Sequence, residues 1–147
     1  MNKLAIIVGS VFGGASALAE EIGEMASHHG VEYEVLEDPT LAQLEGADFW
    51  LFVTSTTGQG DVPPNLEPFV EELREQFPML GHTQTSILAL GDSSYSDSFC
   101  GAGKQVQELL EELGSNQVLE MLKIDACEYF EPLEGAKKWL DELFEHA

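Results

Sequence analysis

The sequence has 147 residues, 44% of them hydrophobic, and carries 27 acidic against 6 basic side chains, a formal net charge of −21 at pH 7. This length and apolar content suit one domain over residues 1–147, and the negative charge disfavours binding to nucleic acid or to an anionic membrane. Cys100 and Cys127 form no C-x-x-C pair, which argues against a disulfide framework or a zinc site. The amino terminus has an apolar run too short for a signal peptide or a membrane span, and we expect a cytoplasmic monomer.

The first predicted element is a strand over Leu4–Val8, which ends in a run of small residues with paired glycines at 13 and 14. Helical spacing begins at Ala15, and Gly30 stands where a helix cap belongs. A turn from strand to helix of this kind directs backbone N–H groups and the positive end of the helix dipole at one point, which suits a phosphate. A plain turn without a ligand is the alternative. The sequence lacks the G-x-G-x-x-G and G-K-[ST] patterns of the common nucleotide loops.

The next two predicted strands differ in how they are covered. Val31–Val35 alternates apolar and acidic residues, which is typical of a strand at a sheet edge, whereas Phe49–Val53 is continuously apolar, as in a central strand. The segment 38–46 between them is too short and broken for an assignment. The central strand runs into Thr54–Pro64, a loop of hydroxyl residues and glycines.

The second half of the chain repeats the alternation of helix and strand. Its expected elements are a helix over Leu66–Phe77, a strand over Ile87–Leu90, a loop over Gly91–Gly101, a helix over Val106–Leu113, a strand over Val118–Ile124 and a helix over Ala136–Phe144. This pattern predicts an α/β fold, an open sandwich with a five-stranded parallel sheet in the order 2-1-3-4-5 and helices on both faces. The loops after strands one, three and four would then converge at the switch point where such sheets bind ligands.

The ligand expected at this point is a phosphate monoester with a flat ring. None of the six basic residues lies in the three loops, so backbone N–H groups, the helix dipole and the hydroxyls of Ser10 and Ser16 would hold the phosphate. Tyr95 in the third loop offers an aromatic plate for a heteroaromatic ring.

The three loops resemble those of the flavodoxin family. Ser10–Ala15 is similar to its FMN phosphate loop, Thr54–Asp61 resembles its second flavin loop, and Gly91–Tyr95 followed by Phe99–Ala102 closely matches its third. The resemblance covers essentially the whole chain and is strongest to short-chain flavodoxins of the YqcA and MioC group.

The resemblance implies FMN as cofactor and a low-potential electron carrier, not an enzyme, with no catalytic residues and no metal. Single electrons would pass from a ferredoxin-NADP reductase-type donor to acceptor enzymes with basic docking faces, through the semiquinone/hydroquinone couple. The cofactor-binding residues that it implies are Ser10, Val11, Phe12, Gly13, Gly14, Ala15, Ser55, Thr56, Thr57, Gly58, Gln59, Gly60, Gly91, Asp92, Ser94, Tyr95, Phe99 and Cys100.

The resemblance also assigns roles within the flavin loops. Tyr95 would stack on one ring face and Thr57 would face the other, with Asp92 and the backbone near Cys100 along the ring edges. The Gly58–Gln59 peptide would turn its carbonyl toward flavin N5–H on one-electron reduction, a change that glycine makes easy. Phe12 and Ala15 replace hydroxyl residues of the family pattern, which removes about two hydrogen bonds of roughly 0.5–1.5 kcal/mol each.

Other functions fit the residues less well. An FMN-dependent quinone or small-molecule reductase is the open alternative, since Thr57 leaves one ring face less covered. A phosphoacceptor receiver domain would need carboxylates where Gly9–Ser10 and Thr54–Ser55 stand, and a serine hydrolase would need a G-x-S-x-G elbow that is missing. Near the end of the fifth strand, Cys127, Tyr129 and Phe130 could cover the core or contact a partner.

Overall fold

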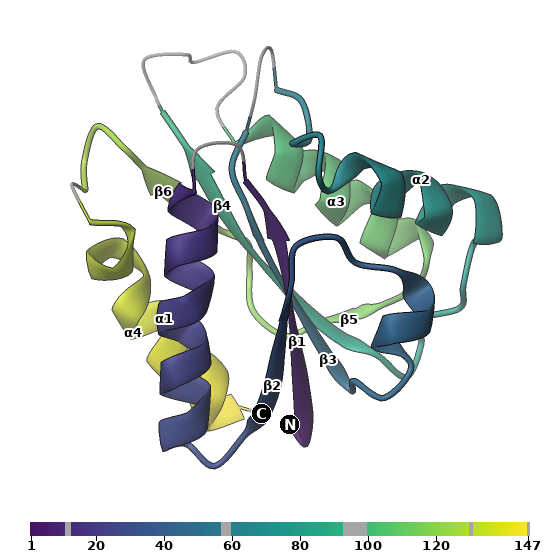
Figure 1. The fold of residues 1–147 in the computed structure, drawn as a ribbon, viewed down its shortest axis with the longest axis horizontal. Coiled ribbons are helices and arrows are strands. Elements are labelled where there is room, and N and C mark those ends of the chain that lie inside the picture. Colours follow the sequence, from purple (N-terminus) through teal and green to yellow (C-terminus); the bar gives the residue numbers. More distant parts are fainter. Residues whose placement is uncertain (11–12, 57–59, 93–99, 130, 147) are drawn as a thin grey trace.

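The computed structural model of the chain describes residues 1–10, 13–56, 60–92, 100–129 and 131–146. Their strands form one parallel sheet in the order β2-β1-β3-β4-β5, and β6 also pairs with β4 (Figure 1). The predicted α/β class and strand order are confirmed. No helix within the described ranges is long and apolar enough to cross a membrane.

The elements follow one another as the alternating pattern predicts. Their bounds are β1 Lys3–Gly9, α1 Gly14–His28, β2 Glu32–Leu36, the 3-10 helix η1 Leu41–Leu44, β3 Phe49–Thr54, α2 Glu67–Gln76, β4 Gln84–Gly91, α3 Gly101–Glu112, β5 Asn116–Gln117, β6 Leu122–Asp125 and α4 Pro132–His146. The unassigned segment 38–46 contains η1, which begins with reciprocal hydrogen bonds between Thr40 and Gln43.

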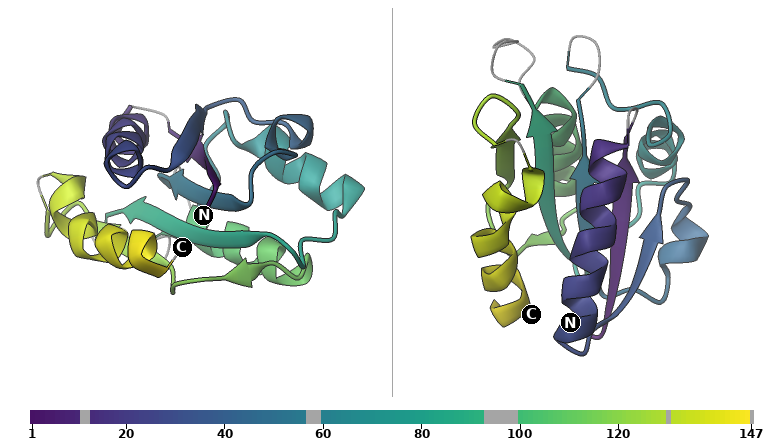
Figure 2. Two further views of the ribbon diagram at one scale, coloured as in Figure 1. Left: turned by 90° about the horizontal axis from the view of Figure 1, so that it is seen from below. Right: turned by 60° about the vertical axis from the view of Figure 1, so that its left-hand side comes forward.

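Helices cover both faces of the sheet, α1 and α4 on one side and α2 and α3 on the other (Figures 1 and 2). Successive side chains of a strand point to opposite faces, so β1 contributes Leu4, Ile6 and Val8 to the core under α1 and α4. Its Ala5 and Ile7 pack into the core under α2 and α3. Every residue of β3 is buried, as its continuous apolar pattern predicts.

The predicted fifth strand over Val118–Ile124 is wrong in one respect, because it is interrupted. From Thr85 to Leu88 the chain advances three residues along β4, whereas its partner advances five, from Gln117 to Leu122. Two extra residues therefore leave the ladder. The indole Nε1 of Trp139 in α4 donates to the carbonyl oxygen of Glu120 at 3.1 Å within this excursion, and the neighbouring Val118 and Leu119 pack against the core under α1 and α4.

The carboxyl ends of β1, β3 and β4 lie side by side at the top of the sheet in Figure 1. Gly9 pairs with Thr54, and Thr54 pairs in turn with Ala89. The backbone N–H of Ser55 donates to the carbonyl oxygen of Gly9 at 2.8 Å, which extends the ladder one residue past the strand. The first residues of the three loops are thereby held at the carboxyl end of the sheet.

Candidate functional site

The turn from β1 into α1 forms an open cradle of backbone donors. Gly13 is the N-cap of α1 with φ +86°, and a Cβ added to Gly13 or Gly14 would meet no atom of the described residues within 4 Å. A helix leaves its first N–H groups without intrahelical acceptors, and its dipole makes that end positive. Ala15, in contrast, is fully buried, so its side chain belongs to the core. This donor set fits a phosphate.

The hydroxyls near the cradle have different partners. Ser10 Oγ accepts a hydrogen bond of 3.0 Å from the Gly13 N–H, which leaves the Ser10 hydroxyl proton for another acceptor. Ser16 Oγ donates to Glu37 Oε1 at 2.6 Å. The sequence also offered Ser16 as a phosphate ligand, but in the structure its hydroxyl holds the carboxylate that follows β2.

Asn65 is a residue of this site that the sequence analysis missed. Its Oδ1 accepts from the backbone N–H of Ser10 at 2.9 Å, and its Nδ2 donates to the carbonyl oxygens of Val8 at 2.7 Å and Glu37 at 2.6 Å. One amide therefore fixes the end of β1, the start of the phosphate loop and the segment after β2. Its sequence neighbours Pro63 and Pro64 indicate only a turn before a helix.

The second loop begins in a tightly packed strand end. Thr54 is fully buried, and its Oγ1 donates to the carbonyl oxygen of Ser55 at 2.9 Å. A Cβ at Gly9 would lie 2.5 Å from Thr54 Oγ1, so glycine is required at the end of β1. Thr56 Oγ1 accepts a hydrogen bond of 3.4 Å from the backbone N–H of Ala102, which ties the second loop to α3.

The described end of the second loop also rests on α3. Gly60 is buried and has φ +94°, and its carbonyl oxygen accepts a hydrogen bond of 2.7 Å from Gln105 Nε2. A Cβ at Gly101 would lie 2.7 Å from the Cα of Gly60, so the two backbones are in direct contact. The second and third predicted loops therefore meet at these glycines.

Cys100 ends the third loop with its side chain in the core. The residue is fully buried, has φ +55° as the N-cap of α3, and its Sγ donates to the carbonyl oxygen of Ala89 at 3.6 Å. Burial raises the pKa of the Cys100 thiol to about 11. The thiol is therefore neutral at physiological pH, and the side chain of Cys100 belongs to the core.

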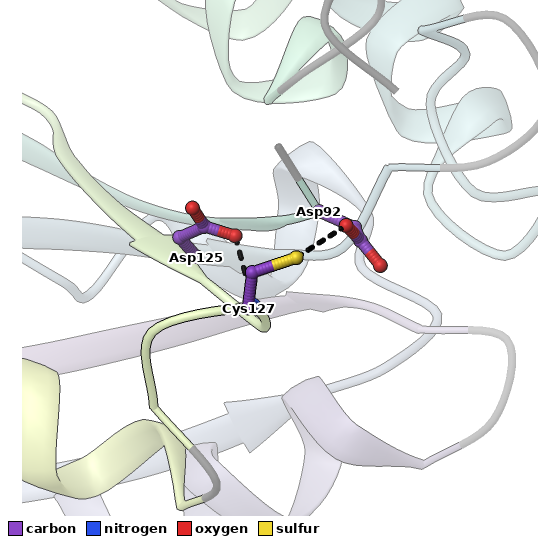
Figure 3. Close-up of side chains that lie close together, drawn as sticks. All are labelled: Asp92, Asp125 and Cys127. Atoms are coloured by element: carbon purple, nitrogen blue, oxygen red, sulfur yellow. Dashed lines mark hydrogen bonds between the residues drawn. The ribbon is translucent and has the colours of Figure 1, made fainter. Parts of the chain in front are cut away.

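At the start of the third loop, Asp92 is joined to the end of β6 (Figure 3). The exposed Cys127 Sγ donates to Asp92 Oδ1 at 3.0 Å, and the Cys127 N–H donates to Asp125 Oδ1 at 2.9 Å. The N–H of Ala126 also donates to the carbonyl oxygen of Gly91 at 2.8 Å. In Figure 3 the thiol points at Asp92, so Cys127 belongs to the site edge and not to the core.

The structure brings ten of the residues implied by the resemblance to the same end of the sheet. They are Ser10, Gly13, Gly14, Ala15, Ser55, Thr56, Gly60, Gly91, Asp92 and Cys100. The others lie outside the described residues: Val11, Phe12, Thr57, Gly58, Gln59, Ser94, Tyr95 and Phe99, as does Phe130.

Comparison with known proteins identifies the family. The family model described as Flavodoxin matches residues 6–139. The chain is 38% identical to Flavodoxin YqcA of Escherichia coli strain K12 over 97% of this chain and 96% of that protein, and 37% identical to Protein MioC of the same strain over 95% of each. It superposes on a cysteine-to-alanine mutant of the flavodoxin from Pseudomonas aeruginosa with a TM-score of 0.92, at 40% identity and with 98% and 97% of the two chains covered. The chain therefore belongs to the flavodoxin family of FMN-binding electron-transfer proteins.

Proposed function

We propose that residues 1–147 form one FMN-binding domain that carries single electrons from a separate reductase to acceptor enzymes. The observation that carries this proposal is the open glycine cradle at the amino end of α1, set beside the ends of β3 and β4 and without a basic side chain in any of the three loops. FMN supplies the redox chemistry when bound. The protein supplies the binding contacts for FMN and the environment of the flavin ring.

The cradle would hold the phosphate of FMN through neutral donors. Backbone N–H groups at the exposed start of α1, with the Ser10 hydroxyl, would receive the anion at the positive end of the helix. The resemblance implies that Tyr95 and Thr57, which lie outside the described residues, would cover the two faces of the ring system. The carboxylate of Asp92, oriented by Cys127, would lie along a ring edge.

The charge of the chain favours a carrier of low potential. Acidic side chains outnumber basic ones by 27 to 6, and a negative potential disfavours the addition of negative charge to a bound flavin. The semiquinone/hydroquinone couple should therefore lie at a low potential. The same charge would guide encounter with basic faces of a ferredoxin-NADP reductase-type donor and of an acceptor enzyme in the cytoplasm.

An absorbance spectrum of the purified protein tests the cofactor. A yellow protein, or an apoprotein that quenches the fluorescence of added FMN with one-to-one stoichiometry, supports the proposal. A colourless fold that leaves FMN fluorescence unchanged would contradict it. Stepwise reduction should then pass through a blue neutral radical before the second electron is added.

A second experiment separates the carrier from the alternative, an FMN-dependent quinone or small-molecule reductase. The FMN-loaded protein is mixed with NADPH and a quinone, with and without an added ferredoxin-NADP reductase. Turnover that depends on the added reductase supports a carrier. Steady NADPH oxidation by the protein alone would establish the enzyme instead.

A further inference from the structure

We propose that Gln105 is a positioning residue of the flavin site. Its side-chain amide holds the carbonyl group of Gly60 and so fixes the carboxyl-terminal end of the second flavin loop. This inference rests on the proposed function, because the loop concerned is the one assigned to the flavin ring. Gln105 lies in the second turn of α3, outside all three loops that the sequence pattern singles out.

The contact between Gln105 and Gly60 is direct and joins distant parts of the chain. Gln105 Nε2 donates to the carbonyl oxygen of Gly60 at 2.7 Å across 45 residues of sequence. Gly60 is buried and its φ of +94° lies in the region that favours glycine. A buried carbonyl group without a hydrogen-bond donor costs free energy. The amide of Gln105 therefore stabilises the backbone conformation that turns the Gly60 carbonyl toward α3.

The other end of the same loop segment is held by the same helix. The backbone N–H of Ala102 donates to Thr56 Oγ1 at 3.4 Å, and Gly101 packs directly on the Cα of Gly60. α3 therefore contacts the second loop at Thr56 and at Gly60, before and after residues 57–59, which lie outside the described residues. Thr56 and Gly60 are both held by one rigid body.

α3 is suited to this role because it is firmly packed. Ala102, Val106, Leu109 and Leu110 are buried in the core, and a Cβ at Gly103 would lie 2.7 Å from the Cβ of Ala89 in β4. The position of Gln105 is thus set by the central sheet. Close support of this kind keeps polar groups within the narrow geometry that a binding site needs.

The contact between Gln105 and Gly60 should affect the difference in affinity of the protein for oxidised and one-electron-reduced FMN. Fixed positions at Thr56 and Gly60 would limit the directions from which the second loop can approach the ring, and a difference in affinity between two states requires different contacts with each. Without the Gln105 amide, the backbone at Gly60 would be free to take more orientations. Both forms of FMN then bind more weakly, and the difference between them shrinks.

The test replaces Gln105 by methionine, which keeps the length of the side chain and removes the donor. Gln107→Met is the matched control, because Gln107 lies on the same helix and donates to Gln117 Oε1 at 3.4 Å, away from the flavin loops. We expect Gln105→Met to weaken FMN binding about tenfold and to lower the equilibrium constant for forming one-electron-reduced FMN by a similar factor. A tenfold change in that constant brings the two one-electron potentials closer by about 59 mV. Gln107→Met should retain both wild-type values.

Amide hydrogen exchange on the apoprotein gives a reading that needs no cofactor. The amides of Gly60 to Val62 should exchange faster in Gln105→Met than in the wild type or in Gln107→Met, while those of α3 stay protected. If Gln105→Met does not fold, Gln105→Asn, whose amide is one methylene short of the carbonyl, takes its place. Unchanged exchange together with unchanged potentials would overturn the inference. Failure of the proposed function would look different, because the wild type itself would then bind no FMN.

Discussion

The Oδ1 atom of Asn65 accepts a hydrogen bond of 2.9 Å from the backbone N–H of Ser10, a residue 55 positions earlier in the chain. The same side chain donates to the carbonyl oxygens of Val8 and Glu37. A half-buried amide before α2 thus sets the entrance of the proposed phosphate cradle.

Replacement of Asn65 by alanine should therefore affect both stability and FMN binding. Loss of the three hydrogen bonds, with their partners left in place, should cost about 1–3 kcal/mol of unfolding free energy. FMN affinity should fall about tenfold, which corresponds to roughly 1.4 kcal/mol. Urea unfolding and fluorescence titration measure the two effects. Asn116→Ala is the control, since Asn116 Nδ2 donates to the Gly81 carbonyl at 2.8 Å near the opposite end of β4. It should lose stability without losing FMN affinity, and an unchanged affinity in Asn65→Ala would contradict the prediction.

The two neighbouring glycines of the cradle should respond in opposite directions to alanine. Gly13 has φ +86°, so Gly13→Ala should destabilise the apoprotein by about 1–2 kcal/mol through backbone strain. Gly14 is the first residue of α1 and has open space at its Cβ position, so Gly14→Ala should stabilise the apoprotein by about 0.5–1 kcal/mol. Urea midpoints of the two apoproteins compare these effects. Equal midpoints would show that the left-handed geometry of Gly13 is not needed.

Two glycines of α3 provide another matched pair. A Cβ at Gly101 meets the backbone of Gly60 in the second loop, whereas a Cβ at Gly103 meets Ala89 and Met121 in the core. Each alanine variant should lose about 1–3 kcal/mol from overpacking. Only Gly101→Ala should also weaken FMN binding, because only its methyl group displaces a flavin loop. Similar FMN affinities in both variants, measured by fluorescence titration, would argue against contact between the second and third loops.

Cys100 should make stability depend on pH in the alkaline range. Burial raises the pKa of its thiol from the ordinary 9.0 to about 11 in the folded chain. Between these values the folded state binds more protons than the unfolded state, so this contribution to stability is complete below pH 9 and falls as the pH rises toward 11. The slope cannot exceed about 1.4 kcal/mol per pH unit. The stability difference between the wild type and Cys100→Ala, measured by urea unfolding at several pH values, should show this decline. A difference that stays constant from pH 8 to 11 would contradict it.

The sequence predicted the parts of the fold that depend on local pattern. The continuous apolar run of β3 and the alternating run of β2 distinguish a central from an edge strand, and both positions in the sheet are confirmed. The interruption at 118–121 was not foreseen, because Val118, Leu119 and Met121 look like strand residues whether they pair with β4 or pack against the core. The pairing register on either side of these residues and the hydrogen bond from Trp139 to Glu120 separate the two arrangements.

The site was predictable to the same extent. Glycines at 13 and 14 and the loops after β1, β3 and β4 follow from residue type and topology. The partners of Asn65, Ser16 and Gln105 do not, because a hydrogen bond between residues 21 to 57 positions apart leaves no periodic signal in the sequence. Cys100 matched a loop motif, yet its side chain turned out to serve the core.

A cradle without lysine or arginine gives ionic strength two opposite effects on this protein. A dianionic phosphate approaching a chain of charge −21 is repelled at long range, and added salt screens that repulsion. The affinity for FMN should therefore increase as the salt concentration rises. Attachment to a cationic redox partner should weaken over the same range of concentrations. Dilute buffer therefore favours docking, and concentrated buffer favours retention of the prosthetic group.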